Sequence, residues 1–225
     1  MRTTLLQTSL LPLVLCLVSG CWSDETLIFP PGLEPVAEVN EASFPAPQEG
    51  DAFPEELVVV RTIARDAVRM PPCVHARGYV HAPLTVVWEA LRNPDVSADR
   101  RSFASYTVMQ DVEPDYDFSY AVVATINNII TFSYTTTFRH GVVEGSVTAP
   151  QAVAEVWSKT EGSSIISELR GSIVARAVTP EVTSLEMIQF SRTPMSNHAD
   201  NEAYLRQVYS DVLALSQGLP LPAAR

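Results

Sequence analysis

Side chains that could support catalysis are few in this chain of 225 residues. It contains three cysteines and four histidines, namely His75, His81, His140 and His198. None of them shows the Cys/His spacing of a zinc site. The chain also lacks a Gly-x-Ser-x-Gly nucleophile motif, a phosphate-binding loop and a metalloprotease helix. We therefore predict no catalytic residue, no metal and no cofactor, and an enzyme is the less favoured class.

Glu155 is the carboxylate whose environment the sequence makes most unusual. It precedes Trp157 by two residues, and residues two apart on a strand point to the same face. If Trp157 points inward, Glu155 is buried with it, and without a partner its pKa is raised. Alternatively, Glu155 lies at an exposed strand edge. His140 precedes Gly141 and is expected at a strand end or turn, and His198 is expected near a helix start.

The cysteine chemistry is expected at the N-terminus. Arg2 precedes an apolar run that extends from Leu10 to Val18, which is too short to span a bilayer and is typical of a secretory signal. The run ends in Leu17-Val18-Ser19-Gly20-Cys21, which resembles the bacterial lipobox, where a signal peptidase cuts before an acylated cysteine. The resemblance implies that residues 1–20 are a signal peptide and that Cys21 carries lipid. An ordinary secretory signal with a chance cysteine is the alternative.

Acylation of Cys21 would make this chain a membrane-anchored protein of the bacterial cell envelope, because buried acyl chains hold a protein at a bilayer. Trp22 and Ser23 directly follow Cys21, where enteric bacteria use an Asp to retain a lipoprotein at the inner membrane. By that sorting rule we expect the outer membrane, with the domain in the periplasm or at the surface. Cys73 is then left without a partner for a disulfide, and we expect it to be a small buried apolar residue.

The net charge of −11 is concentrated before the folded region. Residues 21–56 carry nine acids, no Lys or Arg and six prolines, whereas residues 57–225 carry only −3. This composition predicts an extended acidic tether over residues 21–53. The near-neutral remainder lacks the clustered basic surface of a nucleic-acid binder.

Hydrophobic periodicity predicts an α+β domain over residues 73–218, followed by a tail at 219–225. Residues 54–72 form a lead-in that is either helical, beginning at Pro54, or extended, because Val58, Val59 and Val60 are β-branched. A strand over 74–80 and a helix that begins at Pro83 follow, with a short helix over 95–102. Further strands are predicted at 106–112, 118–126, 131–138, 152–159, 164–178 and 182–192, with a final amphipathic helix over 200–216.

This order resembles the helix-grip fold of the SRPBCC superfamily, which includes START-like lipid-transfer and polyketide cyclase-like proteins. The resemblance is carried by the segment Tyr79-Val80-His81-Ala82-Pro83-Leu84-Thr85-Val86-Val87-Trp88-Glu89-Ala90-Leu91, by Leu169-Arg170-Gly171-Ser172, and by Thr183, Leu185 and Met187. It implies a curved antiparallel sheet of about seven strands, wrapped around a long C-terminal helix, with two short helices after the first strand. A lipocalin is a less favoured alternative, because the chain has two early helices and no Gly-x-Trp near the first strand.

Such a fold implies an internal cavity that binds a lipid or another hydrophobic small molecule. The candidate ligand-binding residues are the inward apolar and aromatic ones: Phe118, Tyr120, Phe132, Tyr134, Phe138, Trp157, Leu185, Met187 and Tyr209. The same residues could instead fill a solid core. Two other functions stay open, namely a polyketide cyclase-like enzyme acting on an aromatic substrate, and an envelope protein-interaction module with a vestigial cavity. Converging polar groups would favour the enzyme, and a large exposed apolar patch would favour the interaction module.

Overall fold

A computed structural model describes residues 27–36, 44, 45, 47, 48, 50–62, 73–127, 129–194 and 198–223. The predicted signal peptide and Cys21 lie outside these residues. The elements follow the predicted order: β1 (Val58–Thr62), β2 (Cys73–Val80), α1 (Leu84–Leu91), α2 (Pro94–Ser97), β3 (Ser105–Gln110), β4 (Phe118–Asn127), β5 (Thr131–Ser146), β6 (Ala149–Gly162), β7 (Glu168–Thr179), β8 (Val182–Arg192) and α3 (His198–Ser216). None of the helices in these ranges is long and apolar enough to cross a membrane.

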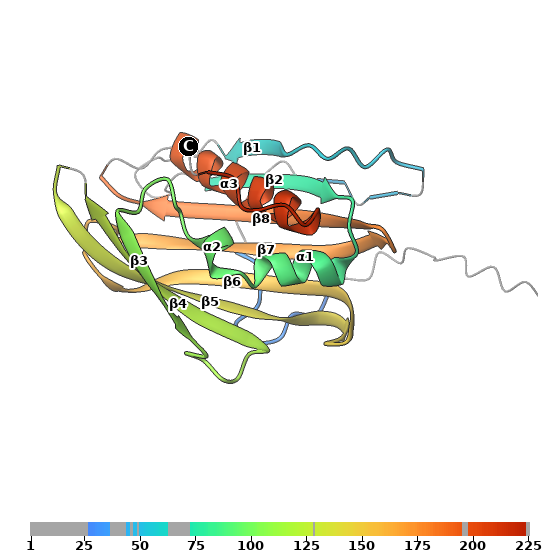
Figure 1. Ribbon diagram of the computed structural model, residues 1–225, viewed down its shortest axis with the longest axis horizontal. Coiled ribbons are helices and arrows are strands. Elements are labelled where there is room, and N and C mark those ends of the chain that lie inside the picture. The colour runs from blue at the N-terminus through green and yellow to red at the C-terminus, as the bar shows by residue number, and fades with distance from the viewer. Residues whose placement is uncertain are drawn as a thin grey trace, which may run out of the picture.

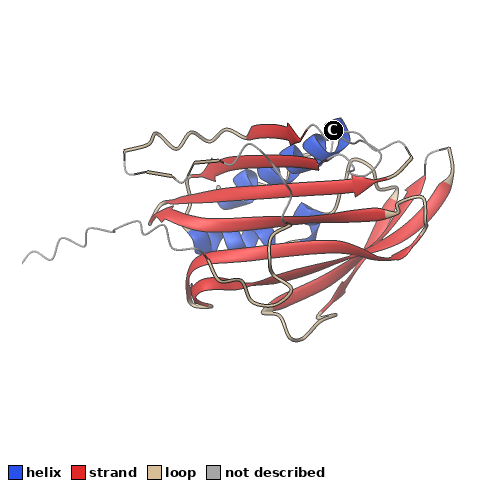
Figure 2. Ribbon diagram, turned by 180° about the vertical axis from the view of Figure 1, so that it is seen from behind, coloured by secondary structure: helices blue, strands red, loops and turns tan. Residues whose placement is uncertain are grey.

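The strands form one antiparallel sheet in the order β1-β2-β8-β7-β6-β5-β4-β3. The sheet curves around the helices, as Figures 1 and 2 show from its two sides. β1 and β3 are its two edges, so the sheet is open and is not the closed barrel of a lipocalin. The described strands number eight, one more than expected, because β1 comes from the lead-in.

The described part of the lead-in is extended, which was one of its two predicted conformations. Val58 pairs with Arg77 and Thr62 with Cys73, so β1 adds to the edge of β2. A run of three valines fits a pleated strand better than a helix, because branching at Cβ restricts the side chain against the preceding helical turn. The helix predicted to begin at Pro54 does not form over the described residues.

The helices lie on the concave face of the sheet (Figure 1). Pro83 is the N-cap of α1, as predicted, and the helix buries Leu84, Val87, Trp88, Ala90 and Leu91. α2 is shorter than the predicted 95–102 and ends at Ser97. α1 and α3 pack against each other, and on the sheet α3 packs against β2 and β8 while α1 packs against β6 and β7. This arrangement leaves the concave face of β3, β4 and β5 largely uncovered by helices.

Part of the acidic tether lies against the convex face of the sheet. Leu33 is only 2% exposed and packs over Gly141, where a Cβ atom would come within 2.5 Å of its Cδ1. The Val36 N–H donates to Ser172 Oγ at 3.0 Å. Farther along, Phe44 meets the His75 ring edge-on at 4.8 Å. The composition predicted an extended tether here, but these contacts hold Leu33, Val36 and Phe44 on the domain.

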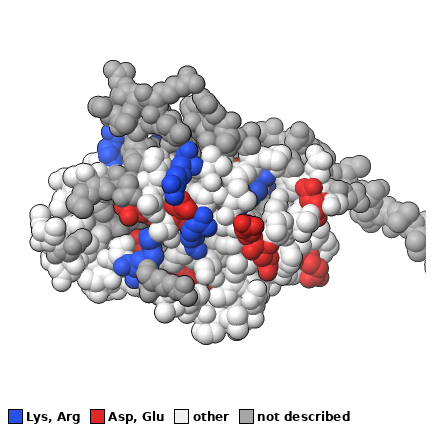
Figure 3. Space-filling model, turned by 90° about the horizontal axis from the view of Figure 1, so that it is seen from above, with Lys and Arg blue, Asp and Glu red and all other residues white. Residues whose placement is uncertain are grey.

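Charged side chains are interspersed on the described surface seen in Figure 3, where basic and acidic groups lie next to one another. Arg61 and Arg206 both form ion pairs with Glu202 of α3. Most of the surface in this view is uncharged. The folded region therefore presents no extended field of one sign on this face.

Candidate functional site

The predicted ligand-binding residues all lie in or beside the space between sheet and helices, but they form two groups. The first is a ladder of rings across β4, β5 and β6. Tyr120 stacks on Phe138 at 4.9 Å between centroids, and Phe138 stacks on Trp157 at 6.0 Å. Tyr120, Phe138 and Trp157 are buried, whereas Phe118 remains partly exposed.

The second group lies under α3 and adjoins the Trp157 end of the ladder, since Trp157 meets Tyr204 of α3 at 5.9 Å between ring centroids. Leu185 and Met187 are fully buried on β8. Tyr209 packs over Gly78, where no side chain would fit, and its hydroxyl donates to the Tyr79 carbonyl at 2.6 Å. The polar atom of Tyr209 is therefore satisfied within the protein, and this group has the character of a packed core.

Trp157 also has a partner for its polar atom. Its Nε1–H donates to Gln189 Oε1 at 3.1 Å. The indole lies over Gly171, and a Cβ atom there would overlap with the ring. Packing thus explains the glycine in the segment Leu169-Arg170-Gly171-Ser172, because only glycine leaves room for Trp157 at position 171.

His140 lies inside β5 rather than at a strand end or turn, so its predicted position was wrong. It is fully buried and pairs with Phe118 of β4 on one side and with Glu155 of β6 on the other. The strand continues to Ser146, although its sequence loses alternation after Phe138. Pairing with β4 ends at His140, and beyond it β5 pairs with β6 alone.

Glu155 points to the concave face, as the inward alternative required, and is 1% exposed. Ser97 at the end of α2 donates its hydroxyl to Glu155 Oε1 at 2.8 Å. The Ser97 carbonyl in turn accepts from the Tyr204 hydroxyl of α3 at 3.0 Å. These two hydrogen bonds link α2 and α3 to β6 on the concave face of the sheet.

Several buried polar atoms have no hydrogen-bond partner among the residues that the structure describes. They include Glu155 Oε2, both ring nitrogens of His140, the Tyr120 hydroxyl and Trp88 Nε1. The Tyr120 and His140 rings lie 5.5 Å apart, and His140 and Glu155 are directly opposed on neighbouring strands. We call Tyr120, His140 and Glu155 the buried polar cluster. Such groups usually find a partner, because an unsatisfied buried polar atom costs roughly 1–3 kcal/mol.

Burial sets the protonation of this cluster. It raises the pKa of Glu155 to about 8, an effect that the Ser97 hydroxyl partly offsets. It lowers the pKa of His140 to about 3, and the positive charge of Arg92 acts in the same direction. Burial and then the Glu155 carboxyl raise the pKa of Tyr120 well above its ordinary value. At neutral pH the cluster is therefore mostly uncharged, with Glu155 as a carboxylic acid and His140 as a neutral imidazole.

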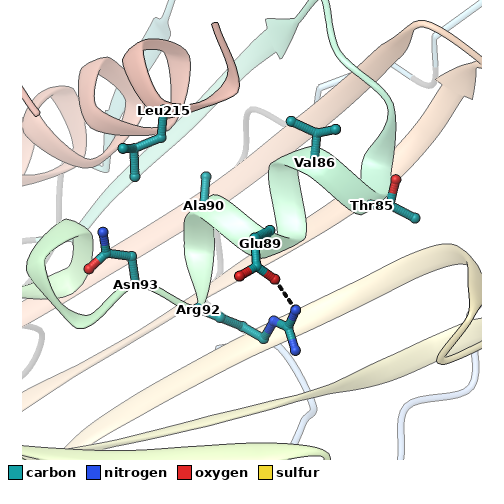
Figure 4. Close-up of a pocket in the computed structure, with 7 residues that line it drawn as sticks. All are labelled: Thr85, Val86, Glu89, Ala90, Arg92, Asn93 and Leu215. Carbon is teal, nitrogen blue, oxygen red and sulfur yellow. Dashed lines mark hydrogen bonds and ion pairs between the residues drawn. The ribbon is translucent and has the colours of Figure 1, made fainter. Parts of the chain in front are cut away.

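Arg92 lies at the rim of this region. Its guanidinium stacks on Trp88 at 4.9 Å, approaches the Phe118 ring at 5.9 Å and pairs with Glu89. Arg92 also lines an open pocket of about 560 Å³ on the outer side of α1 (Figure 4). The other lining residues are Thr85, Val86, Glu89, Ala90, Asn93 and Leu215. This pocket faces solvent and does not include the buried polar cluster.

Apolar side chains continue from the cluster along the concave face of β3, β4 and β5, where Phe103 from the segment after α2 packs against Tyr106 and Tyr134. We call five of them the apolar strip; they are half-buried and lie on the three strands at the β3 edge of the sheet: Tyr106, Val108, Phe118, Ile126 and Phe132. Phe118 precedes Tyr120 by two residues on β4, so the apolar strip and the buried polar cluster share one face and adjoin. The sequence indicated the aromatic members of this face and, as one alternative, the inward position of Glu155, but it did not indicate His140.

The element order, the sheet order and the position of α3 define an α+β helix-grip fold, as the resemblance to the SRPBCC superfamily implied. No protein-family model matches the chain, and no curated protein matches it. Among solved structures, human StAR-related lipid transfer protein 5 is similar, with 11% identity, a TM-score of 0.47, and coverage of 72% of this chain and 80% of that one.

Two bacterial structures are also similar to this chain. A Thermus thermophilus protein has 13% identity, a TM-score of 0.45, and coverage of 64% of this chain and 98% of its own. An aromatase/cyclase from a Streptomyces species has 17% identity, a TM-score of 0.40, and coverage of 65% and 91% respectively. Likeness at this level does not carry a function over, so the fold rests on the topology of the chain itself.

Proposed function

We propose that the domain binds a hydrophobic small molecule on the concave face of its sheet. The ligand lies along the apolar strip and directs a polar group toward the buried polar cluster. The observation that carries this proposal is the set of unpartnered polar atoms of Tyr120, His140 and Glu155, buried directly beside half-buried aromatic side chains. An apolar concave surface with a few placed polar groups is the usual composition of a small-molecule site.

A test of binding uses two neighbouring positions that point to opposite faces of β3. Val108 belongs to the apolar strip, whereas Met109 follows it and is 47% exposed. Val108→Asn is expected to weaken the binding of an apolar fluorescent probe by about tenfold, since burying the amide against an apolar ligand leaves it unsatisfied. Met109→Asn, the matched control, should leave probe binding unchanged. Equal binding by both variants and the unaltered chain would exclude the apolar strip as the site.

Native purification supplies a second readout. Solvent extraction of the purified chain, followed by mass spectrometry, should release an apolar compound in about one-to-one ratio with the protein. The Val108→Asn chain, purified in the same way, should carry less of it. A chain that carries no compound and binds no apolar probe would contradict the proposal.

We further propose that the domain is held at a bacterial membrane through acylated Cys21, with the outer membrane as its site. Support comes from the Leu17-Val18-Ser19-Gly20-Cys21 segment and the absence of an Asp directly after it. Metabolic labelling with a fatty acid should mark the chain, and Cys21→Ser should abolish the label and release the protein from the membrane fraction. Labelling that survives this substitution would contradict the proposal.

A polyketide cyclase-like enzyme is the second candidate, and one observation favours it. The buried polar cluster places a carboxylic acid, a neutral imidazole and a phenol on one buried surface, which are groups that can donate and accept protons. If the chain is such an enzyme, Glu155→Gln should abolish turnover of an aromatic polyketide-like substrate while the substrate still binds. Turnover that is unaffected by this change would remove the cluster from the chemistry.

A protein-interaction module has weaker support. The large apolar residues exposed in the described parts of the chain lie on separate elements, such as Val86 on α1, Ile130 beside β5 and Val147 after β5. Scattered residues of this kind are ordinary on protein surfaces. We therefore place the function at the concave face.

A further inference from the structure

Three neighbouring strands each contribute one polar side chain to the buried polar cluster. Tyr120 comes from β4, His140 from β5 and Glu155 from β6. A phenol and a carboxylic acid each offer one O–H donor, and a neutral imidazole offers one N–H donor and one acceptor nitrogen. Ser97 donates to one oxygen of Glu155 and also lies near the Tyr120 hydroxyl, without a hydrogen bond of good geometry to it. The second oxygen of Glu155 and both ring nitrogens of His140 have no partner among the described residues. The cluster is therefore rich in free donors.

The surroundings of the cluster disfavour a charge. The ionisable groups that act on it from the helices are Tyr204 of α3, whose hydroxyl donates to Ser97, and Arg92, a cation at the rim whose Nη2 pairs with the exposed Glu89. Arg92 itself would favour an anion, so the case against a charged ligand group rests on the burial of the cluster. Glu155 itself is held as a neutral acid because it is fully buried. A carboxylate or phosphate brought in by a ligand would lose its hydration in the same place and meet the same cost.

We propose that the ligand presents an uncharged carbonyl oxygen to Tyr120, His140 and Glu155, with its apolar remainder on the apolar strip. This inference rests on the proposed function and names the class of compound that the site selects. A carbonyl oxygen has two lone pairs and no proton, so it accepts hydrogen bonds from two of the three donors at a time and adds no donor of its own. The preferred ligand is thus an apolar carbonyl compound rather than a fatty acid or a phospholipid.

Three naphthalene probes of nearly equal size separate these possibilities. They are 2-acetylnaphthalene, which carries a carbonyl; 2-isopropenylnaphthalene, in which a CH₂ group replaces the oxygen; and 2-naphthoate, which is an anion. The affinity of each is measured with the purified full chain at pH 7. We expect the ketone to bind about tenfold or more tighter than the hydrocarbon, as one or two good hydrogen bonds would give, and 2-naphthoate to bind weakest.

Variants test whether the tighter binding of the ketone depends on the buried polar cluster. Tyr120→Phe and His140→Phe should each lower the affinity for the ketone by about threefold to tenfold and leave the affinity for the hydrocarbon nearly unchanged. Tyr79→Phe is the matched control, because Tyr79 lies on β2 outside both the buried polar cluster and the apolar strip. This control should retain the full preference for the ketone.

The outcomes separate the two proposals. If none of the three probes binds, both the proposed function and this inference fail. If the hydrocarbon binds as tightly as the ketone, or if 2-naphthoate binds most tightly, the domain binds apolar ligands but the carbonyl inference is overturned. A Tyr120→Phe variant that weakens all three probes equally would likewise overturn it, because the loss would then reflect a disturbed fold rather than a lost hydrogen bond.

Discussion

His140 of β5 and Glu155 of β6 are directly opposed on the concave face of the sheet, yet neither ring nitrogen of His140 has a hydrogen-bond partner among the described residues. Directly opposed side chains of an antiparallel pair have Cβ atoms about 5 Å apart. An ion pair would be the ordinary outcome at this distance. Burial instead keeps both groups neutral, since it raises the pKa of Glu155 to about 8 and lowers the pKa of His140 to about 3.

These opposed shifts predict an asymmetric dependence of stability on pH. The raised pKa of Glu155 gives stability that is fully present below pH 4.5 and is lost as pH rises through about 8. The lowered pKa of His140 gives stability that is present above pH 6.5 and is lost as pH falls through about 3. Between pH 4.5 and 6.5 the two contributions to the free energy of unfolding change with pH in opposite directions and cancel. Between pH 6.5 and 8 only the contribution of Glu155 still changes with pH.

The free energy of unfolding should therefore fall by roughly 2 kcal/mol between pH 6.5 and 8, measured by urea denaturation. Glu155→Gln should remove this fall, because the amide does not ionise. The matched control is Glu161→Gln, since Glu161 lies on the same strand and is exposed. A fall that persists in Glu155→Gln would show that another group causes it.

Tyr120→Phe is expected to stabilise the ligand-free protein. The Tyr120 hydroxyl is fully buried and has no hydrogen bond of good geometry, although Ser97 and Glu155 are near enough to influence its pKa. Removing an unsatisfied polar atom should raise the free energy of unfolding by about 1 kcal/mol. Tyr204→Phe should lower it by a similar amount, because that hydroxyl donates to the Ser97 carbonyl. Urea denaturation measures both changes. A Tyr120→Phe variant that is less stable than the unaltered chain, together with a Tyr204→Phe variant that is more stable, would contradict this account.

Gly171→Ala should destabilise the domain by about 1–3 kcal/mol, since the added Cβ overlaps with the Trp157 indole and approaches the Ile188 carbonyl. Thermal unfolding measures the loss, and the near-ultraviolet circular dichroism of tryptophan should change with it. The double variant Gly171→Ala with Trp157→Phe should recover part of the loss attributable to the clash. A single variant as stable as the unaltered chain would mean that the sheet can shift to admit the methyl group.

Gly141→Ala tests the docking of the acidic tether. Its Cβ would meet the Leu33 side chain, which belongs to the tether and can move away without disturbing the sheet. We expect faster proteolysis within residues 27–36 and a change of less than about 1 kcal/mol in domain stability. Leu33→Ala should give the same result by removing the docked side chain. Unchanged proteolysis in both variants would show that Leu33 does not hold the tether on the sheet.

Local pattern was enough to predict most of the fold. Alternation along 118–126 and 131–138, Pro83 before an apolar helix, and the final amphipathic segment each depend on neighbours in sequence, so they predicted β4, the start of β5, α1 and α3. Local pattern also predicted that Glu155 shares a face with Trp157. The lead-in shows its limit, because residues 58–62 suit either a helix or a strand until β2 offers an edge to pair with.

The polar centre of the candidate site was decided by tertiary structure. His140 looked like a turn residue because glycine follows it and alternation stops, and only pairing with β6 carries the strand onward and opposes His140 to Glu155. Sequence determined which side chains could donate or accept a proton. Their burial, their shared surface and their neutral state depend on strand register and on the helices above them, and these are long-range contacts that no local pattern encodes.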